Sequence, residues 1–248
     1  MKLFSQILLI LFLLTISTFS QNHQTYFSAG YSIPTTTSVL STSQYDDQSF
    51  DQLVSTYSKG FILNGGYQFL VNNNFILDLG INYFFGNKNE EYFSTEISNS
   101  NYTNSNFSIV PTVNIKFDIG NFSPYTKFGC SFNLIKLQMD LDYIIGSTRF
   151  EYEYVYKGNV AIGFVGGIGV NYLFNQSLVG FIEAQLNSLT YYPSELHLTQ
   201  ILSNGEKNTT IFNLKENFKY NNTNEHVIPS EDFPFSSLSF ILGLRIVL

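Results

Sequence analysis

Histidine, the commonest general base near neutral pH, occurs only three times in this 248-residue chain, as His23, His197 and His226. Ser194, Glu195 and His197 supply the residue types of a hydrolase nucleophile, orienting group and base. That chemistry needs all three side chains within hydrogen-bond reach, and neighbouring residues of an irregular loop meet this condition only by chance. We therefore interpret them as solvated loop polarity and expect no catalytic residues.

Metal and cofactor motifs do not occur in the sequence either. Asp46, Asp47 and Asp51 lie close together but lack the spaced oxygen ligands of a calcium loop. The histidines and the single cysteine, Cys130, match no zinc-ligand spacing. The glycines of segment 163–169 lie in an apolar run, which favours tight packing over phosphate binding. We expect no metal, no cofactor and no enzymatic activity.

Charged residues within apolar segments are the more informative set. The six that occupy alternating positions of such segments are Asp78, Lys116, Asp118, Lys127, Glu183 and Arg245. An unpaired charge in a protein interior is costly, so we expect these side chains to form a network of ion pairs and hydrogen bonds. The sequence predicts a pair between Arg245 and Glu183, and a contact of one of the two lysines with an aspartate. Such a network either fills an interior or forms a gate that opens when the pairs exchange.

The overall composition limits which elements can carry these residues. Apolar residues make up 44% of the chain and charged residues 12%, yet the mean hydropathy is only +0.03. A bundle of transmembrane helices would score far higher, because each helix needs about 20 consecutive apolar residues. Acidic residues outnumber basic ones by 19 to 12, and the net charge of −7 argues against a nucleic-acid partner. A chain this rich in apolar residues but without long apolar runs has to alternate apolar with polar residues.

Apolar and polar residues alternate with a period of two in eight segments, which indicates β-strands. The candidate strands lie near 25–34, 58–71, 74–86, 107–119, 123–138, 157–174, 177–192 and 236–248. Short connections rich in Asn, Gly or Gln follow the second, fourth and sixth strands, at 72–73, 120–122 and 175–176. Long polar connections separate the other strands, at 35–57, 87–106, 139–156 and 193–235.

This plan predicts an all-β fold, an eight-stranded antiparallel transmembrane β-barrel with meander topology. Its apolar face would meet lipid, and its polar face, with the six charged residues, would line a narrow lumen. Short turns would be periplasmic and long loops extracellular, with aromatic girdles at both membrane interfaces. The girdle residues are Tyr26, Phe27, Phe69, Phe75, Phe117, Phe122, Tyr172 and Phe174 near the short turns, and Phe61, Phe85, Tyr191 and Tyr192 near the loops.

Two alternatives stay open. A soluble β-sandwich would also accommodate aromatic-rich alternating strands. Segments 141–145 and 150–156 would extend strands five and six as a hairpin, and 196–202 and 209–214 flank another hairpin turn. These segments would raise the strand number to ten, but they are more polar and lack a lipid-facing run. Eight strands are therefore preferred.

Residues 1–20 have the features of a secretory signal peptide. Lys2 precedes an apolar run from Ile7 to Ile16, and the small residues Thr18 and Ser20 precede a cleavage site at residue 21. The sequence therefore predicts that residues 1–20 are removed and that residues 21–248 form the barrel domain.

The strand plan, the cleavage site and the alternating last strand resemble the small outer-membrane β-barrels related to OmpA and OmpX. In the last strand, Phe240, Leu242, Leu244, Ile246 and Leu248 share one face. The chain is also similar to outer-membrane barrel-domain proteins of Bacteroidetes, including PorT-like ones, although family members usually end in an aromatic residue. The resemblance implies a location in the bacterial outer membrane, contact with its lipid, and the barrel-assembly machinery as a partner during biogenesis.

The sequence and the resemblance together favour a non-enzymatic role. We expect a structural or surface-interaction protein that presents four long extracellular loops, on a rigid scaffold, to an extracellular or secretion-system protein. The first alternative is a narrow pore or a component of a secretion or transport system. A lipid-modifying outer-membrane enzyme is the third hypothesis.

Overall fold

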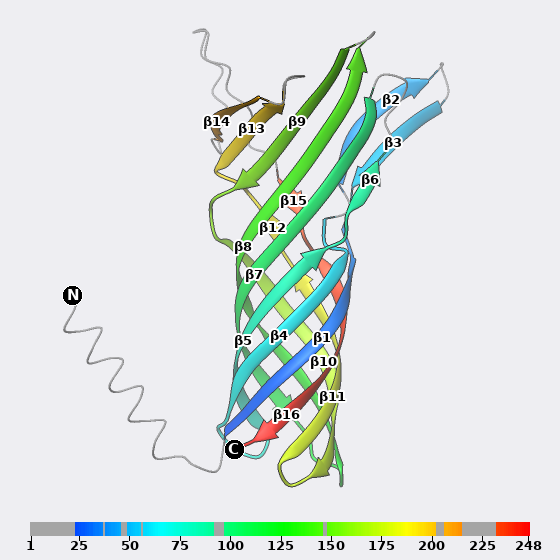
Figure 1. The fold of residues 1–248 in the computed structure, drawn as a ribbon. Helices are drawn as coiled ribbons and strands as arrows, with labels where there is room; N and C mark the ends of the chain where they lie inside the picture. Colours follow the sequence, from blue (N-terminus) through cyan, green and yellow to red (C-terminus); the bar gives the residue numbers. More distant parts are fainter. Residues whose placement is uncertain are drawn as a thin grey trace, which may run out of the picture.

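The computed structural model consists of β-strands and their connections (Figure 1). The residues that it describes are 23–36, 38–45, 49–55, 57–91, 97–145, 148–201, 206–214 and 232–248. Among these residues, no helix is long and apolar enough to cross a membrane. The predicted signal peptide, Asp46, Asp47 and His226 lie outside the described residues.

Eight antiparallel strands form a closed barrel, because β1 pairs with the last strand, β16, as well as with β4. The barrel strands are β1 (His23–Pro34), β4 (Gly60–Leu70), β5 (Phe75–Gly86), β7 (Ile97–Lys116), β8 (Phe122–Ile145), β10 (Ala161–Asn175), β11 (Leu178–Ser188) and β16 (Ser237–Val247). Each is hydrogen-bonded to the barrel strand before and after it in the chain. The predicted eight-stranded meander barrel is confirmed.

Alternation of side chains gives the barrel wall its two faces. In β5, Leu77, Leu79 and Ile81 are 49–50% exposed, whereas Ile76 and Asp78 are 2% and 8% exposed. Successive side chains of a strand point to opposite faces, so the first set lies outside the barrel and the second lies in the lumen.

Asparagine side chains and a glycine shape the short turns. Asn72 Oδ1 accepts hydrogen bonds of 2.9 Å from the backbone N–H groups of Asn74 and Phe75 in the β4–β5 turn. Asn175 Oδ1 accepts two equivalent bonds of 2.9 Å in the β10–β11 turn. Gly120, in the β7–β8 turn, has a φ angle of 62°, which glycine adopts without steric cost. The Asn and Gly residues of the short connections therefore reverse the chain by a mechanism that the sequence indicates.

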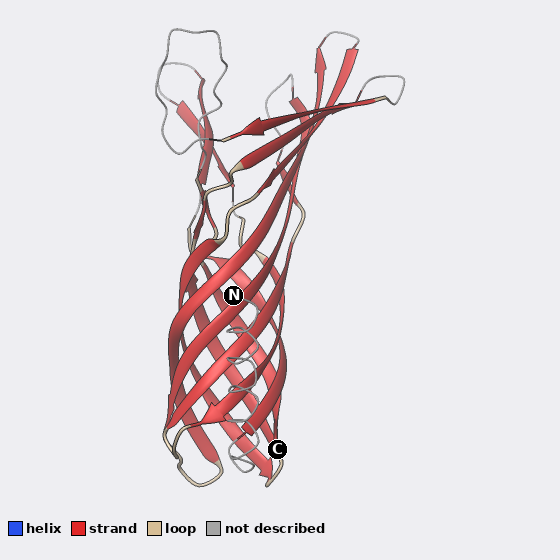
Figure 2. Ribbon diagram, turned by 90° about the vertical axis from the view of Figure 1, so that its left-hand side faces the viewer, coloured by secondary structure: helices blue, strands red, loops and turns tan. Residues whose placement is uncertain are grey.

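Strands β7 and β8 continue past the barrel and carry a second group of strands beyond its end (Figure 2). Their distal parts pair with β6 (Asn89–Glu91) and β9 (Thr148–Lys157), and β9 pairs with β13 (Glu195–Ile201), which pairs with β14 (Lys207–Asn213). We call this arrangement the protruding sheet. Both hairpins suggested by the sequence are present, but they extend this sheet and leave the barrel with eight strands.

The chain leaves the protruding sheet at a backbone kink. The sixth strand was expected to span residues 157–174, but Lys157 ends β9 and the barrel strand β10 begins at Ala161. Gly158 and Asn159 between them have φ angles of 90° and 50°. Glycine and asparagine tolerate positive φ best, so these two residues let the chain turn from β9 into the barrel wall.

Two further strand pairs lie between barrel strands; three of their four strands fall in predicted loops, and the fourth, at 190–191, falls at the end of the predicted strand 177–192. β2 (Ser38–Tyr45) and β3 (Ser49–Ser55) form a hairpin within segment 35–57. β12 (Thr190–Tyr191) pairs with β15 (Phe233–Pro234). The first hairpin is rich in Ser, Thr and Gln and lacks a continuous apolar face, so it resembles a loop in composition.

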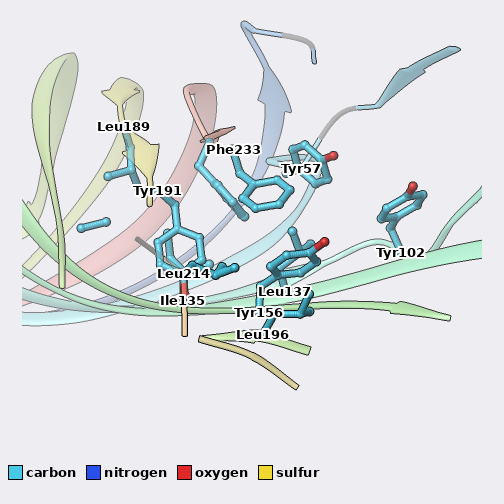
Figure 3. Packing of buried hydrophobic residues seen from close by; sticks show 12 residues of the cluster. Tyr57, Tyr102, Ile135, Leu137, Tyr156, Leu189, Tyr191, Leu196, Leu214 and Phe233 are labelled. Atoms are coloured by element: carbon cyan, nitrogen blue, oxygen red, sulfur yellow. The ribbon is translucent and has the colours of Figure 1, made fainter. Parts of the chain in front are cut away.

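A cluster of buried apolar side chains packs together where the loop end of the barrel meets the protruding sheet (Figure 3). We call this cluster the apolar plug; it comprises Tyr57, Tyr102, Ile135, Leu137, Tyr156, Ala161, Leu189, Tyr191, Leu196, Leu214, Phe233 and Phe235. Several of its rings pack edge to face, as between Tyr57 and Phe233, whose centroids are 5.4 Å apart, and Tyr57 also stacks on Phe235. The plug joins residues of the barrel strands to residues of the loops and of the protruding sheet.

The prediction that Tyr191 and Tyr26 belong to the aromatic girdles is wrong. Tyr191 is fully buried in the apolar plug. Tyr26 points into the lumen, where its ring meets that of Phe181 edge-on at 6.1 Å. Tyr26 is inward because it follows the alternation of β1, whose neighbouring residue Phe27 is 64% exposed on the outside.

Candidate functional site

The outside of the barrel is an apolar surface that all eight barrel strands share. One large side chain from each strand illustrates this, with exposures of 42–68%: Phe27, Phe61, Leu79, Ile109, Phe132, Ile168, Ile182 and Leu242. Soluble proteins do not expose apolar surface of this extent, whereas a membrane-spanning barrel requires it. Cys130 is free and exposed on this face, between Phe128 and Phe132.

The lumen, in contrast, is filled with amide, hydroxyl and charged side chains. Seven amide side chains point into the lumen and are at most 8% exposed: Asn64, Gln68, Asn82, Asn114, Asn133, Asn171 and Gln185. Several bond to one another or to serines, as Asn64 Nδ2 does to Ser28 Oγ at 3.1 Å. A polar interior inside an apolar exterior reverses the order of a soluble protein, as a barrel in lipid requires.

Lys127 on β8 and Glu183 on β11 form the ion pair of the lumen, with Nζ and Oε1 2.5 Å apart. The hydroxyl of Tyr125 donates a hydrogen bond of 2.7 Å to the other carboxylate oxygen, Oε2. The predicted pair between Arg245 and Glu183 is wrong. In the β11–β16 register, Glu183 lies opposite residue 241, which places Arg245 four residues nearer the short turns, about 13 Å along the strand.

Arg245 on the last strand is held mainly by neutral groups. Its side chain is 4% exposed, and Nη1 donates a hydrogen bond to Asn171 Oδ1. The guanidinium carbon lies 4.2 Å from the centroid of the Phe181 ring and 4.8 Å from that of the Tyr125 ring. Such cation–π contacts stabilise a buried guanidinium. No described carboxylate forms an ion pair with it.

Asp78 on β5 is a buried anion that, like the Arg245 cation, is held by neutral groups, in this case amides. Its Oδ2 accepts hydrogen bonds from Gln68 Nε2 at 2.8 Å and from Asn114 Nδ2 at 3.3 Å. Within the described part of the chain it has no ion-pair partner either. The lumen therefore holds two acidic and two basic side chains, of which only Lys127 and Glu183 are in direct contact.

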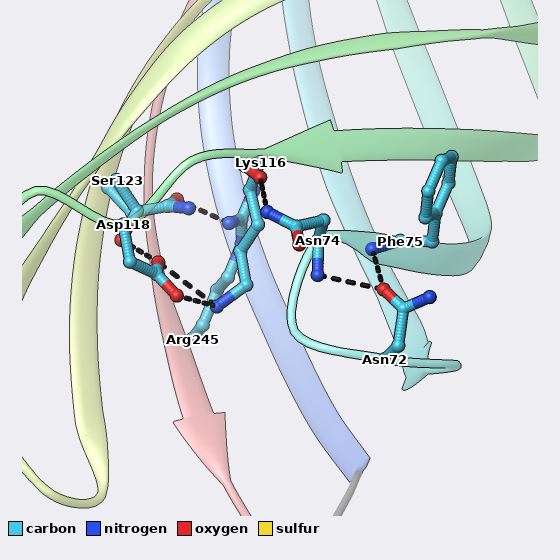
Figure 4. Close-up of polar contacts among 8 residues, drawn as sticks. Asn72, Asn74, Phe75, Lys116, Asp118, Ser123 and Arg245 are labelled. Carbon is cyan, nitrogen blue, oxygen red and sulfur yellow. Dashed lines mark hydrogen bonds and ion pairs between the residues drawn. The ribbon is translucent and has the colours of Figure 1, made fainter.

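Lys116 and Asp118 form a separate pair at the rim of the barrel (Figure 4). Lys116 Nζ lies 3.1 Å from Asp118 Oδ2, and Ser123 Oγ donates a hydrogen bond of 2.6 Å to Oδ1. Asp118 follows the end of β7 and its side chain is half exposed, so it lies at the mouth and not inside the lumen. Partial burial raises the pKa of this carboxyl, but the Ser123 hydrogen bond and Lys116 outweigh burial and lower the pKa below its ordinary value.

Two small cavities lie in the lumen at mid-height. A cavity of about 20 Å³ lies beside the four charged side chains, and one of about 30 Å³ lies nearer the apolar plug. Each has room for one or two water molecules. A wider vestibule of about 310 Å³ is present at the short-turn end, lined by Lys116, Asp118 and Arg245 among others.

The serine, glutamate and histidine of the fourth long connection do not assemble a catalytic triad. Glu195 and His197 share one face of β13 and approach each other to 3.1 Å. The hydroxyl of Ser194 lies instead against the backbone of Gly158. Among the described residues, no group of three His, Cys, Asp or Glu side chains is placed to hold a metal ion.

The protruding sheet provides the largest structured surface beyond the barrel. Its outermost described strand, β14, is exposed at Lys207, Asn208, Thr209, Thr210, Ile211 and Asn213. On β8 and β9, Asp140 lies opposite Glu153 and Asp142 opposite Glu151, which gives one face of the sheet an acidic character. The sequence predicts the two hairpins of this sheet but neither their pairing into one surface nor the apolar plug. The signal for both was the apolar content of the long connections, as at Leu196 and Phe233.

A closed antiparallel barrel with an apolar exterior and a polar lumen defines an outer-membrane β-barrel protein, located in the bacterial outer membrane. Among solved structures, a major outer membrane protein from Thermus thermophilus has a similar fold, with a TM-score of 0.53 and 12% identity over 91% of this chain and 99% of that one. OprG from Pseudomonas aeruginosa aligns with a TM-score of 0.49 and 10% identity over 92% and 97% of the two chains. Neisserial surface protein A aligns with a TM-score of 0.44 and 14% identity over 91% and 97%. No family model and no curated protein sequence matches the chain.

Proposed function

We propose that this protein is a non-enzymatic outer-membrane barrel that binds an extracellular protein partner through its protruding sheet. The observation that carries the proposal is the continuation of β7 and β8 beyond the barrel, over 20 and 24 residues in all, to support β9, β13 and β14. A membrane anchor alone needs strands of only about 9–11 residues. The added strands hold a binding surface in place more firmly than loops do.

The edge strand β14 is the part of this surface best suited to recognition. An exposed edge offers unpaired backbone N–H and C=O groups, to which an extended segment of a partner can add as a further strand. The side chains of β14 are almost all exposed, so they leave the edge accessible. The acidic residues on β8 and β9 favour a partner segment that carries basic residues.

The small lumen cavities and the apolar plug weigh against the alternative of a pore. Ions need a continuous polar path, but the mid-lumen cavities hold about 20 and 30 Å³, and buried aromatic side chains fill the loop end. Glu195 and His197 contact each other, but the Ser194 hydroxyl lies against Gly158, and this arrangement gives no support to a lipid-modifying enzyme.

Photo-cross-linking on whole cells tests the proposal. A cross-linking amino acid in place of Ile211, which is 59% exposed on β14, should give an adduct with the partner, whereas the same group in place of lipid-facing Leu79 should not. Alternate residues of an edge strand direct their N–H groups outward and inward. Of Thr209→Pro and Thr210→Pro, one should therefore abolish the adduct while the protein remains folded. Strand addition would be contradicted if the cross-linking groups at positions 211 and 79 gave the same amount of adduct. It would also be contradicted if neither proline variant reduced the adduct.

We also propose that the chain reaches the membrane by the route that its sequence implies. Removal of residues 1–20 and insertion by the barrel-assembly machinery follow from the signal-peptide pattern and from the alternating last strand. The same features support a relationship to the Bacteroidetes barrel-domain proteins. N-terminal sequencing of protein from the outer membrane should begin at Gln21, and a start at Met1 would contradict this route.

A further inference from the structure

Several buried polar atoms without a hydrogen-bond partner among the described residues surround a single cavity in the lumen. They are Asn64 Oδ1, Gln68 Oε1, Asp78 Oδ1 and Arg245 Nε. All four side chains are more than nine-tenths buried. Leaving such atoms without partners in a low-dielectric interior is costly, so their convergence indicates a binding site.

The chemistry of the occupant follows from the donors and acceptors around the cavity. Gln68 Nε2 donates to the Asp78 carboxylate at 2.8 Å, which fixes the amide orientation and leaves Gln68 Oε1 as an acceptor. Glu183 Oε1 is already 2.5 Å from the Lys127 ammonium. The remaining groups are one donor, Arg245 Nε, and three acceptors. An occupant that accepts one hydrogen bond and donates two fits this arrangement.

Charge and size decide between a water molecule and a metal cation. The cavity is lined by Asp78, Glu183, Lys127 and Arg245, whose formal charges sum to zero. A cation would leave a net positive charge in a low-dielectric site and would lie near two basic side chains. The volume of about 20 Å³ suits one water molecule, which needs roughly 10–15 Å³ and two to four polar partners.

We propose that this cavity binds one structural water molecule that accepts a hydrogen bond from Arg245 Nε and donates to Asp78 Oδ1 and Gln68 Oε1. The water joins the two lumen charges that have no ion-pair partner and links the closing strand β16 to β4 and β5, past the intervening strand β1. Tyr26 lines the same cavity and its hydroxyl has a side-chain hydrogen bond with the Asp78 carboxylate, but the Oδ1 atom of that carboxylate has no hydrogen-bond partner among the described residues.

A crystal structure of the full mature chain at a resolution that shows ordered water tests the proposal. We expect one electron-density peak within about 2.7–3.2 Å of Arg245 Nε, Asp78 Oδ1 and Gln68 Oε1. A second crystal soaked in thallium(I) distinguishes the two occupants. An anomalous peak in this cavity would overturn the water in favour of a cation, and the absence of any density peak there would overturn the site itself.

A matched pair of variants tests the site in solution. Thr112→Leu places a larger side chain in this cavity, whereas Ile109→Leu, on the same strand, changes only the lipid-facing side of the barrel wall. Oxygen-17 relaxation dispersion should detect a long-lived water in the wild type and in Ile109→Leu, and should lose one such water in Thr112→Leu. Equal signals from both variants, or no long-lived water in the wild type, would contradict the proposal; if Thr112→Leu does not fold, the crystal density decides.

Discussion

The ion pair between Lys127 and Glu183 joins β8 to β11 inside the lumen. At the scale of single residues, it is the most deeply buried ion pair of the described residues. Replacing Glu183 by Gln leaves the Lys127 ammonium without its partner in a site from which bulk water is excluded. Breaking a buried pair in this way costs about 3–5 kcal/mol. We predict a loss of that order in the free energy of unfolding, measured by urea unfolding in lipid vesicles.

The double variant Lys127→Met with Glu183→Leu is the matched control for this prediction. Removing both charges eliminates the uncompensated one, so most of the lost stability should return. A double variant no more stable than Glu183→Gln would show that the pair is not the source of the effect.

The pair of Lys116 and Asp118 at the rim of the barrel makes the stability of the folded protein depend on pH. Because the folded-state pKa of Asp118 is lowered, its contribution to stability is present above the ordinary Asp pKa of about 3.9 and is lost as the pH falls through the lower folded value. An NMR titration of the Asp118 carboxyl should place its midpoint below that of an unfolded peptide. Ser123→Ala removes a hydrogen bond to the carboxylate and should move the midpoint upward, and an unchanged midpoint would contradict the assigned cause.

At the scale of elements, the junction between β9 and β10 depends on Gly158. Its φ of 90° is unfavourable for a residue with a side chain, and a Cβ there would lie 1.9 Å from the Ser194 hydroxyl oxygen. We predict that Gly158→Ala destabilises the protein by roughly 1–3 kcal/mol in urea unfolding. Gly166→Ala is the control, because a Cβ at that position in β10 meets no atom within 4 Å. Equal stability of the two variants would contradict the strained junction.

The barrel elements could be predicted because their signals are local. Alternation along β5 and the asparagines at positions 72 and 175 specify strands and turns from neighbouring residues alone. The plug could not be predicted, because Tyr57 and Phe233 lie in two different long connections, Tyr191 lies at the end of a predicted strand, and the three meet only when the barrel closes. The ion pairs could be predicted only in part. The sequence does not show that Glu183 pairs with Lys127 and not with Arg245, because this depends on the register of β8, β10 and β11.

At the scale of the whole molecule, the plug and the polar network close the lumen at two heights. We predict that the protein, folded into planar bilayers, produces no ion-current steps. Glu183→Ala should behave in the same way, because the apolar plug remains in place above the network. Heat-modifiable gel mobility confirms folding in each sample. A reproducible single-channel current from the folded wild type, altered by Glu183→Ala, would support the gated pore instead.

The single cysteine permits the most direct test of the membrane-spanning barrel. Cys130 lies on the outer face of β8 between two exposed phenylalanines, so a nitroxide attached to it should lie in hydrocarbon. The protein is labelled while unfolded and then folded into lipid vesicles, and its electron paramagnetic resonance saturation is measured with oxygen and with a water-soluble nickel complex. The structure predicts strong relaxation by oxygen, which partitions into lipid, and very little by nickel. A nitroxide that the nickel complex reaches freely would contradict a lipid-facing outer surface and with it the outer-membrane barrel.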